Sequence, residues 1–185
     1  DALNRAGSTE PAKLQAALDS ARMWLADAAD TPVVRALHGG NRALVVGRGF
    51  EYPNALELAL KLRETTAMFA DGYSAADLLH GPIASASADV ASIALSTDPA
   101  TEKSIDGSLD RLRAAGAPLL LIRSDASGSR RMGRDEELVL PTGPHGPLCT
   151  PVTAIAGLAI IESVATGRGL NPDAPQGLTK VTKTL

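Results

Sequence analysis

The sequence is poor in the residue types that mark several common classes of protein. Its single cysteine, Cys149, cannot form an internal disulfide, and its three histidines show no zinc-ligand spacing. Aromatic residues make up only 3% of the chain and the net charge is -3, which argues against a basic, base-stacking nucleic-acid surface. We therefore expect no metal, no other cofactor and no nucleic-acid partner, and the lone cysteine fits a reducing, cytoplasmic setting.

Uninterrupted apolar runs are short as well. The longest apolar-rich stretch, residues 153–164, contains Glu162 and falls short of the roughly 20 residues that a membrane span needs. The first five residues include no basic segment leading into an apolar core, so they do not resemble a signal peptide. These features predict no contact with a membrane. The absence of an initial methionine hints that upstream sequence has been removed.

Hydrophobic residues are plentiful, and their pattern predicts an α/β fold. They form 44% of 185 residues, enough for one domain over residues 1–185 to bury a core. Continuous apolar runs of strand length alternate with segments of helical character, which is typical of βαβ units. Strands are predicted at 43–46, 90–95, 119–122 and 137–140, with a possible fifth at 68–73, and helices at 10–29, 53–68, 102–115 and 147–166.

This order predicts a doubly wound parallel sheet of about five strands with helices on both faces. The α/β core would span 43–168, behind an N-terminal helix and ahead of a polar tail at 169–185. In such sheets ligands bind beyond the carboxyl ends of the strands, at the switch point of the strand order. The loops expected there are 47–52, 96–101 and 124–130.

Three charged residues share one face of the helix predicted after the first strand. Glu57, Lys61 and Glu64 lie at i, i+4 and i+7. Seen alone, such a spacing is most often a solvated, salt-bridged surface. Its position changes that interpretation, because the helix follows the Gly47-Arg48-Gly49 turn and its first residues should border the ligand crevice.

Other candidate residues each have an ordinary structural explanation beside a functional one. His80, before Gly-Pro, is a typical turn residue, but facing a sugar it could transfer a proton near neutral pH. Gly47, Arg48 and Gly49 form a tight turn or a phosphate cradle. Lys180 and Lys183 are typical solvated tail residues, yet a lysine desolvated over a pocket can attack a sugar carbonyl as an amine.

Two blocks of sequence carry a resemblance to a known family. The first joins Gly47-Arg48-Gly49, Ala55-Leu56-Glu57, the run from Ala59 to Glu64, Ala70-Asp71-Gly72-Tyr73-Ser74 and His80-Gly81-Pro82. In order and spacing it resembles the second sugar isomerase (SIS) domain of glucosamine-6-phosphate synthase. The tail from Gly169 to Pro175 and from Leu178 to Thr184 is similar to SIS-type glucosamine-6-phosphate deaminases and AgaS-like sugar isomerases.

The resemblance implies roles for the candidates. Glu64 would move a proton between C1 and C2 of the open-chain sugar, while Glu57 and Lys61 help to open the ring and hold its hydroxyls. His80 matches a ring-opening histidine that reaches the active site from another subunit in the synthase. Lys180 matches a tail lysine that can form a Schiff base, with the tail folding over the site. Gly47, Arg48 and Gly49 would bind substrate.

The resemblance also shows departures. Arg63 replaces a lysine, Asp77-Leu78-Leu79 replaces Glu-Leu-Lys, and no Ser-x-Ser-Gly-x-Thr phosphate loop follows a strand. Family enzymes pair two SIS domains, and that loop belongs to the first. The sequence therefore predicts the catalytic, C-terminal half of an aminosugar-6-phosphate deaminase or isomerase that works with a preceding SIS domain, as a homodimer, or both. A non-catalytic sugar-phosphate-binding module, and a fragment that only folds and dimerises, are the alternatives.

Overall fold

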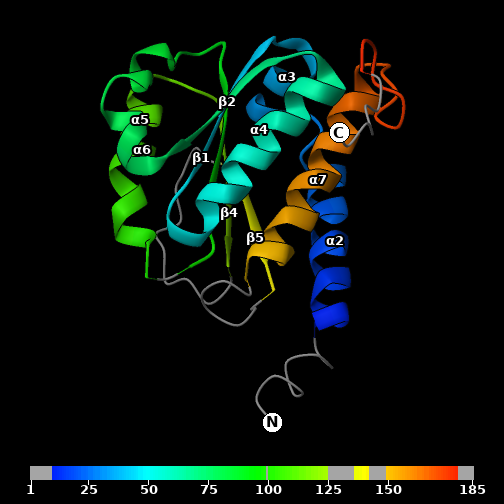
Figure 1. The fold of residues 1–185 in the computed structure, drawn as a ribbon, viewed down its shortest axis with the longest axis horizontal. Coiled ribbons are helices and arrows are strands. Elements are labelled where there is room, and N and C mark those ends of the chain that lie inside the picture. Colours follow the sequence, from blue (N-terminus) through cyan, green and yellow to red (C-terminus); the bar gives the residue numbers. More distant parts are fainter. Residues whose placement is uncertain (1–9, 99, 125–135, 142–148, 179–185) are drawn as a thin grey trace, which may run out of the picture.

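Five parallel strands form one sheet in the order β2-β1-β3-β4-β5 (Figure 1). The computed structural model describes residues 10–98, 100–124, 136–141 and 149–178. The strands are β1 (Arg42–Gly47), β2 (Phe69–Ser74), β3 (Ala91–Ser96), β4 (Leu119–Ser124) and β5 (Glu136–Leu140). The predicted parallel sheet is confirmed, including the possible fifth strand, which forms one edge as β2.

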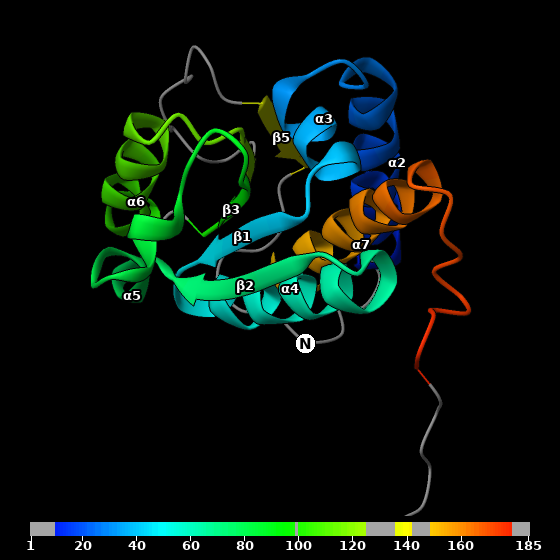
Figure 2. The ribbon, with the colours of Figure 1, turned by 90° about the horizontal axis from the view of Figure 1, so that it is seen from above.

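Helices cover both faces of this sheet, as predicted. Helices α2 (Glu10–Asp27), α3 (Pro32–Gly39), α4 (Tyr52–Thr66) and α7 (Thr150–Gly167) pack on one face, and α5 (Ala75–Leu79) and α6 (Glu102–Ala114) on the other. Figure 2 shows α5 and α6 on one side of the strands and α2, α3 and α7 on the opposite side. Two short 3-10 turns, η1 (Gly49–Glu51) and η2 (Pro82–Ser85), complete the described elements.

Alternating strand residues divide the hydrophobic core into two layers. In β1, Val45 faces the layer under α4 and α7, whereas Leu44 and Val46 face the layer under α5 and α6. Because successive side chains of a strand point to opposite faces, a strand buried on both sides must be apolar throughout. This explains why β1, β3 and β4 appear in the sequence as continuous apolar runs.

Several helix boundaries differ from the prediction by one to three residues, and helix α3 was not predicted. Helix α4 ends at Thr66 because Ala67 adopts a left-handed conformation, with φ 56°. Helix α7 begins at Thr150, later than the predicted 147. Helix α3 has only eight residues, with Val33, Val34 and Leu37 buried, so its periodic pattern is too short to be recognised in the sequence.

Helix α7 has the length and apolar composition of a membrane span, and half of that segment is buried. It lies beside α4 (Figure 1), contacts α2 and α4, and contributes Val152, Ile160 and Val164 to the core. Burial against these helices accounts for its apolar character as a core helix.

Candidate functional site

The Gly47-Arg48-Gly49 turn lies where β1 ends, at the switch point between β1 and β3. A Cβ on Gly47 would lie 2.3 Å from the carbonyl oxygen of Glu51, and Gly49 has φ +59° with Thr101 close by. Both positions therefore require glycine for reasons of backbone geometry. A substrate-binding role for this turn, including Arg48, stays a prediction.

A buried carboxylate at the same place was not predicted from the sequence. Glu51 is 1% exposed. Its Oε2 accepts a hydrogen bond of 2.8 Å from Asn54 Nδ2, and its Oε1 accepts one of 2.9 Å from Thr153 Oγ1 and another from Thr97 Oγ1. These contacts join the loop after β1, the loop after β3 and helix α7. Thr97 and Thr153 are far from Glu51 in the sequence, so no local pattern marks this group.

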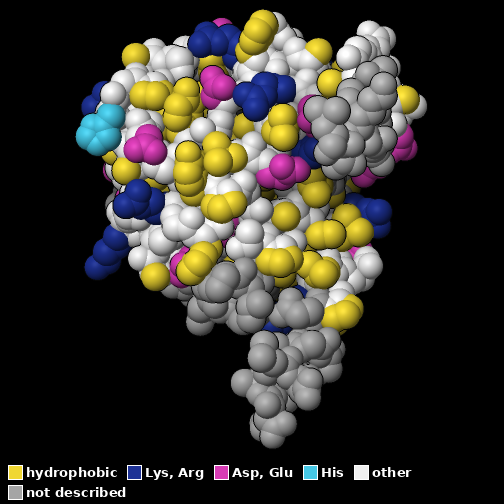
Figure 3. Space-filling view, viewed as in Figure 1, with side chains coloured by type: hydrophobic (Ala, Val, Ile, Leu, Met, Phe, Trp, Pro, Cys, Tyr) yellow, Lys and Arg dark blue, Asp and Glu magenta, His cyan; other side chains and the backbone are white. Residues whose placement is uncertain are grey.

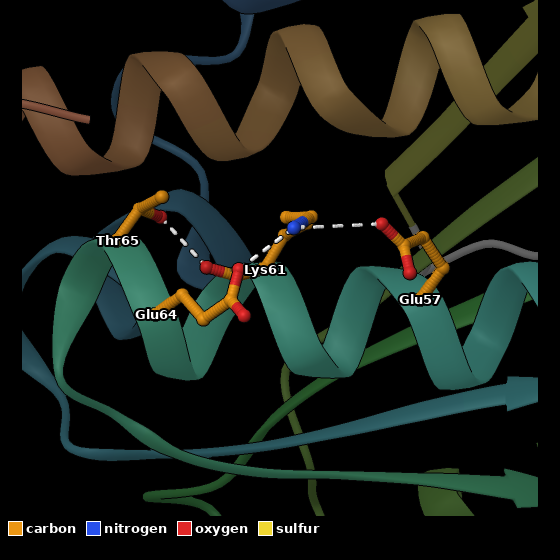
Figure 4. Close-up of polar contacts among 4 residues, drawn as sticks. All are labelled: Glu57, Lys61, Glu64 and Thr65. Carbon is orange, nitrogen blue, oxygen red and sulfur yellow. Dashed lines mark hydrogen bonds and ion pairs between the residues drawn. The ribbon is translucent and has the colours of Figure 1, made fainter. Parts of the chain in front are cut away.

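Glu57, Lys61 and Glu64 meet on one face of α4, as their spacing predicted (Figure 4). Lys61 Nζ lies 2.7 Å from Glu64 Oε2 and 3.7 Å from Glu57 Oε1. The hydrogen bond to Glu64, aided by both carboxylates, raises the pKa of Lys61 above its usual value. The three side chains are 30–49% exposed, so this ion-pair group is open to solvent. We call it the α4 charged stripe.

Apolar side chains accompany the α4 charged stripe on the surface. Leu56 is 44% exposed and Leu60 is 37% exposed. Figure 3 shows hydrophobic side chains over the middle of the molecule, where α4 and α7 lie, with acidic and basic side chains among them. This face of α4 therefore has a mixed charged and apolar character.

A hollow of about 460 Å³ lies at the C-terminal end of α4. One wall comprises Arg63, Glu64, Thr65 and Ala67, and the other is formed by residues of the segment from Gly169 to Leu178. We call it the α4–tail hollow. Its lining residues include the acid Glu64, the base Arg63 and the amides Asn171 and Gln176. Such groups can hydrogen-bond the hydroxyls of a sugar and exchange protons with it.

The α4–tail hollow does not lie at the switch point. Glu64 lies about 18 Å along α4 from Tyr52, since an α-helix rises 1.5 Å per residue. The expectation that the stripe borders the crevice at the carboxyl ends of the strands therefore fits Glu57 better than Glu64. The described part of the tail nevertheless lies beside Glu64.

The structure does not bring every predicted site residue together. His80 follows α5, which lies on the sheet face opposite to α4 (Figure 2). It is exposed, and its backbone N–H donates to the carbonyl of Asp77. Within one chain His80 is thus remote from Glu64. Lys180 and Lys183 lie outside the described residues.

The fold agrees with comparisons to known proteins. The family model of the SIS domain matches residues 36–163. The chain therefore belongs to the SIS domain family, as its sequence blocks predicted.

Curated relatives are longer enzymes. Glutamine--fructose-6-phosphate aminotransferase [isomerizing] of Chlorobaculum tepidum is 34% identical over 145 residues, which are 78% of this chain and 23% of that protein. The enzyme of the same name from Methanothermobacter thermautotrophicus is 36% identical over 137 residues, covering 73% of this chain and 23% of that protein. The chain thus spans about a quarter of the length of these relatives.

Solved structures show the same fold. The C-terminal domain of glucosamine-fructose-6-phosphate aminotransferase from Francisella tularensis superposes with a TM-score of 0.79 at 23% identity, over 89% of this chain and 44% of that one. Glucosamine-6-phosphate deaminase from Thermotoga maritima gives a TM-score of 0.61 at 16% identity, over 93% of this chain and 46% of that one. At these identities the likeness concerns the fold alone.

Proposed function

We propose that this chain is the catalytic SIS domain of an aminosugar-6-phosphate deaminase or isomerase, converting glucosamine 6-phosphate to fructose 6-phosphate and ammonia. The observation that carries the proposal is Glu64, which is both the end of the α4 charged stripe and a wall of the α4–tail hollow. Family membership and relatives named as isomerizing aminotransferases support it.

The proposed chemistry moves two protons and needs no metal. Glu64 would take the proton from C2 of the open-chain sugar and return it to C1, while the proton on the C2 nitrogen or oxygen passes to the oxygen on C1. Starting from the aminosugar, this yields a ketose imine, and water then hydrolyses the imine to the ketose and ammonia. Lys61, held cationic by its two carboxylates, would hydrogen-bond the sugar hydroxyls.

A second unit would complete this site. The α4 charged stripe is exposed and accompanied by exposed leucines, whereas proton transfer at carbon benefits from exclusion of water. His80 lies on the opposite face of its own chain, so we propose that it serves a site formed with another subunit. A preceding SIS domain, as the greater length of the relatives suggests, would bind the sugar phosphate. Lys180 would act from the tail, and a cytoplasmic location would supply the substrate.

The test is an assay with glucosamine 6-phosphate that follows fructose 6-phosphate and ammonia. It would use this chain alone and the longest natural polypeptide that carries it. We expect turnover in the longer polypeptide and its loss by at least 100-fold in Glu64→Gln, because the amide cannot accept the proton. Glu162→Gln, the same change at an exposed position of α7, is the matched control and should keep full activity. Equal activity of Glu64→Gln and the parent would refute the assignment.

A non-catalytic sugar-phosphate-binding module is the second candidate. The solvent exposure of the α4 charged stripe favours this function, because a binding module needs no site from which water is excluded. Calorimetric binding of glucosamine 6-phosphate without turnover in either polypeptide would establish this function in place of the first.

A further inference from the structure

The junction between α7 and the tail contains an arginine anchored across the fold. Helix α7 ends at Gly167, and the next side chain, Arg168, reaches back to α3. Its Nη1 lies 3.1 Å from the carbonyl oxygen of Leu37, 3.1 Å from that of His38 and 2.7 Å from that of Gly40. The last carbonyls of a helix lack partners within the helix and carry partial negative charge, so a guanidinium binds them favourably.

The backbone turns sharply at the same junction. Gly169 has φ +74°, and its N–H donates to the carbonyl of Thr166 at 2.9 Å. The N–H of Leu170 donates to the carbonyl of Ala165 at 2.9 Å. This pattern is a Schellman-type helix end with glycine in the left-handed position. The direction in which the chain leaves α7 is therefore set between Gly167 and Leu170.

Beyond the junction the tail makes only local hydrogen bonds among the described residues. The N–H of Ala174 donates to the carbonyl of Asn171, that of Asp173 to the side chain of Asn171, and that of Leu178 to the carbonyl of Pro175. In the described ranges no hydrogen bond connects residues 171–178 to α4. The segment nevertheless forms one wall of the α4–tail hollow, facing Glu64. Its position against Glu64 thus depends on the junction.

We propose that Arg168 is a positioning residue, which holds the segment 169–178 against the C-terminal end of α4 and thereby keeps the α4–tail hollow closed on one side. Through this wall Arg168 would raise the affinity of the hollow for a phosphorylated aminosugar, a consequence that rests on the proposed function. The residue does not touch the reacting atoms. Its hydrogen bonds to the three carbonyls at the end of α3 hold the start of the tail in place and thereby set the direction that the tail takes.

The first test measures hydrogen exchange by mass spectrometry on the full chain, comparing the parent, Arg168→Gln and Arg168→Lys. We expect exchange in peptides covering 169–178 to become at least tenfold faster in Arg168→Gln, while β1 and β3 exchange as in the parent. Lysine keeps a cation that donates to carbonyls, so Arg168→Lys should lie between the two. Arg22→Gln, at an exposed arginine of α2, is the control and should change nothing. Unchanged exchange at 169–178, or an equal rise in β1 and β3, would overturn the proposal.

The second test titrates glucosamine 6-phosphate by calorimetry into the same variants of the longest natural polypeptide that carries this chain, because a preceding SIS domain is proposed to bind the sugar phosphate. We expect Arg168→Gln to bind at least fivefold more weakly than the parent. Parent-like affinity of Arg168→Gln despite a released tail would show that the tail is no wall of the ligand site, and would overturn that part of the inference. If the parent itself does not bind, the proposed function fails at this site, while the exchange experiment still decides what Arg168 does.

Discussion

Thr153 Oγ1 lies 2.9 Å from Glu51 Oε1, although 102 positions separate the two residues in the sequence. With Asn54 and Thr97 contributing further hydrogen bonds, this contact places a fully buried carboxylate at the switch point of the sheet. Glu51 stands at the N-cap position of α4, but its carboxylate accepts hydrogen bonds from side chains and not from the backbone N–H groups of the helix. Glu51 links β1, β3 and α7 at the edge where such folds usually hold their ligand.

Replacing Glu51 by alanine should destabilise the fold markedly. The substitution removes the buried acceptor that Asn54, Thr97 and Thr153 share. Asn54 keeps its hydrogen bond to the carbonyl of Thr150, and Thr153 keeps one to the carbonyl of Cys149, so we expect a loss of about 1–3 kcal/mol in the free energy of unfolding. Urea unfolding measures this loss, with Glu162→Ala as the exposed-carboxylate control. A change of less than about 0.5 kcal/mol, the ordinary range for surface substitutions, would contradict the role assigned to Glu51.

Gly47→Ala should destabilise the turn after β1, because its Cβ would lie 2.3 Å from a backbone oxygen that a rotamer change cannot move. We expect a loss of more than about 2 kcal/mol. Gly39→Ala is the matched control, since nothing lies within 4 Å of a Cβ there, and alanine in a helix should stabilise by up to about 1 kcal/mol. Thermal unfolding of both variants checks the prediction. Equal melting temperatures would show that the turn tolerates a side chain.

Lys61→Gln should cost little stability, and the cost should depend on pH. The pKa of Lys61 is raised in the folded protein, so its ion pairs stabilise the fold fully below the ordinary lysine pKa and lose this contribution as pH rises through the raised value. Because the side chain is 34% exposed, solvent screening limits the effect to under about 1 kcal/mol. Urea unfolding at neutral and at strongly alkaline pH should show that the difference in unfolding free energy between parent and variant becomes smaller at alkaline pH. A difference in unfolding free energy that becomes larger at alkaline pH would contradict the predicted direction of the pH dependence.

Gly167→Ala should strain the contact between α7 and α3. The added Cβ would lie 2.8 Å from His38 Cε1 and 2.9 Å from His38 Nε2, and overpacking of this kind typically costs about 1–3 kcal/mol. Removing the ring in His38→Ala/Gly167→Ala should recover most of this loss. A double-mutant cycle on unfolding free energies measures the coupling, and additive effects would mean that the two positions do not meet.

Local patterns in the sequence predicted most of the fold. The apolar runs of β1, β3 and β4 reflect burial on both faces of the sheet, and the helical spacing of apolar residues marked α2. Helix-forming residues marked α4, and a long apolar composition marked α7. All of these signals are properties of neighbouring residues. The i, i+4, i+7 spacing also placed Glu57, Lys61 and Glu64 together, because helix geometry alone brings these positions to one face.

Only the tertiary structure decided which residues that are distant in the sequence come into contact. The burial of Glu51, the anchoring of Arg168 on α3 and the approach of the tail to Glu64 all depend on segments that are distant in sequence, and no periodicity encodes such contacts. The sheet separates His80 from Glu64 because α5 and α4 cover opposite faces, and the choice of face is likewise a property of the tertiary structure. The sequence by itself thus determined the elements, the family and the α4 charged stripe, while the packing of distant segments determined where the hollow lies and which residues hold it in place.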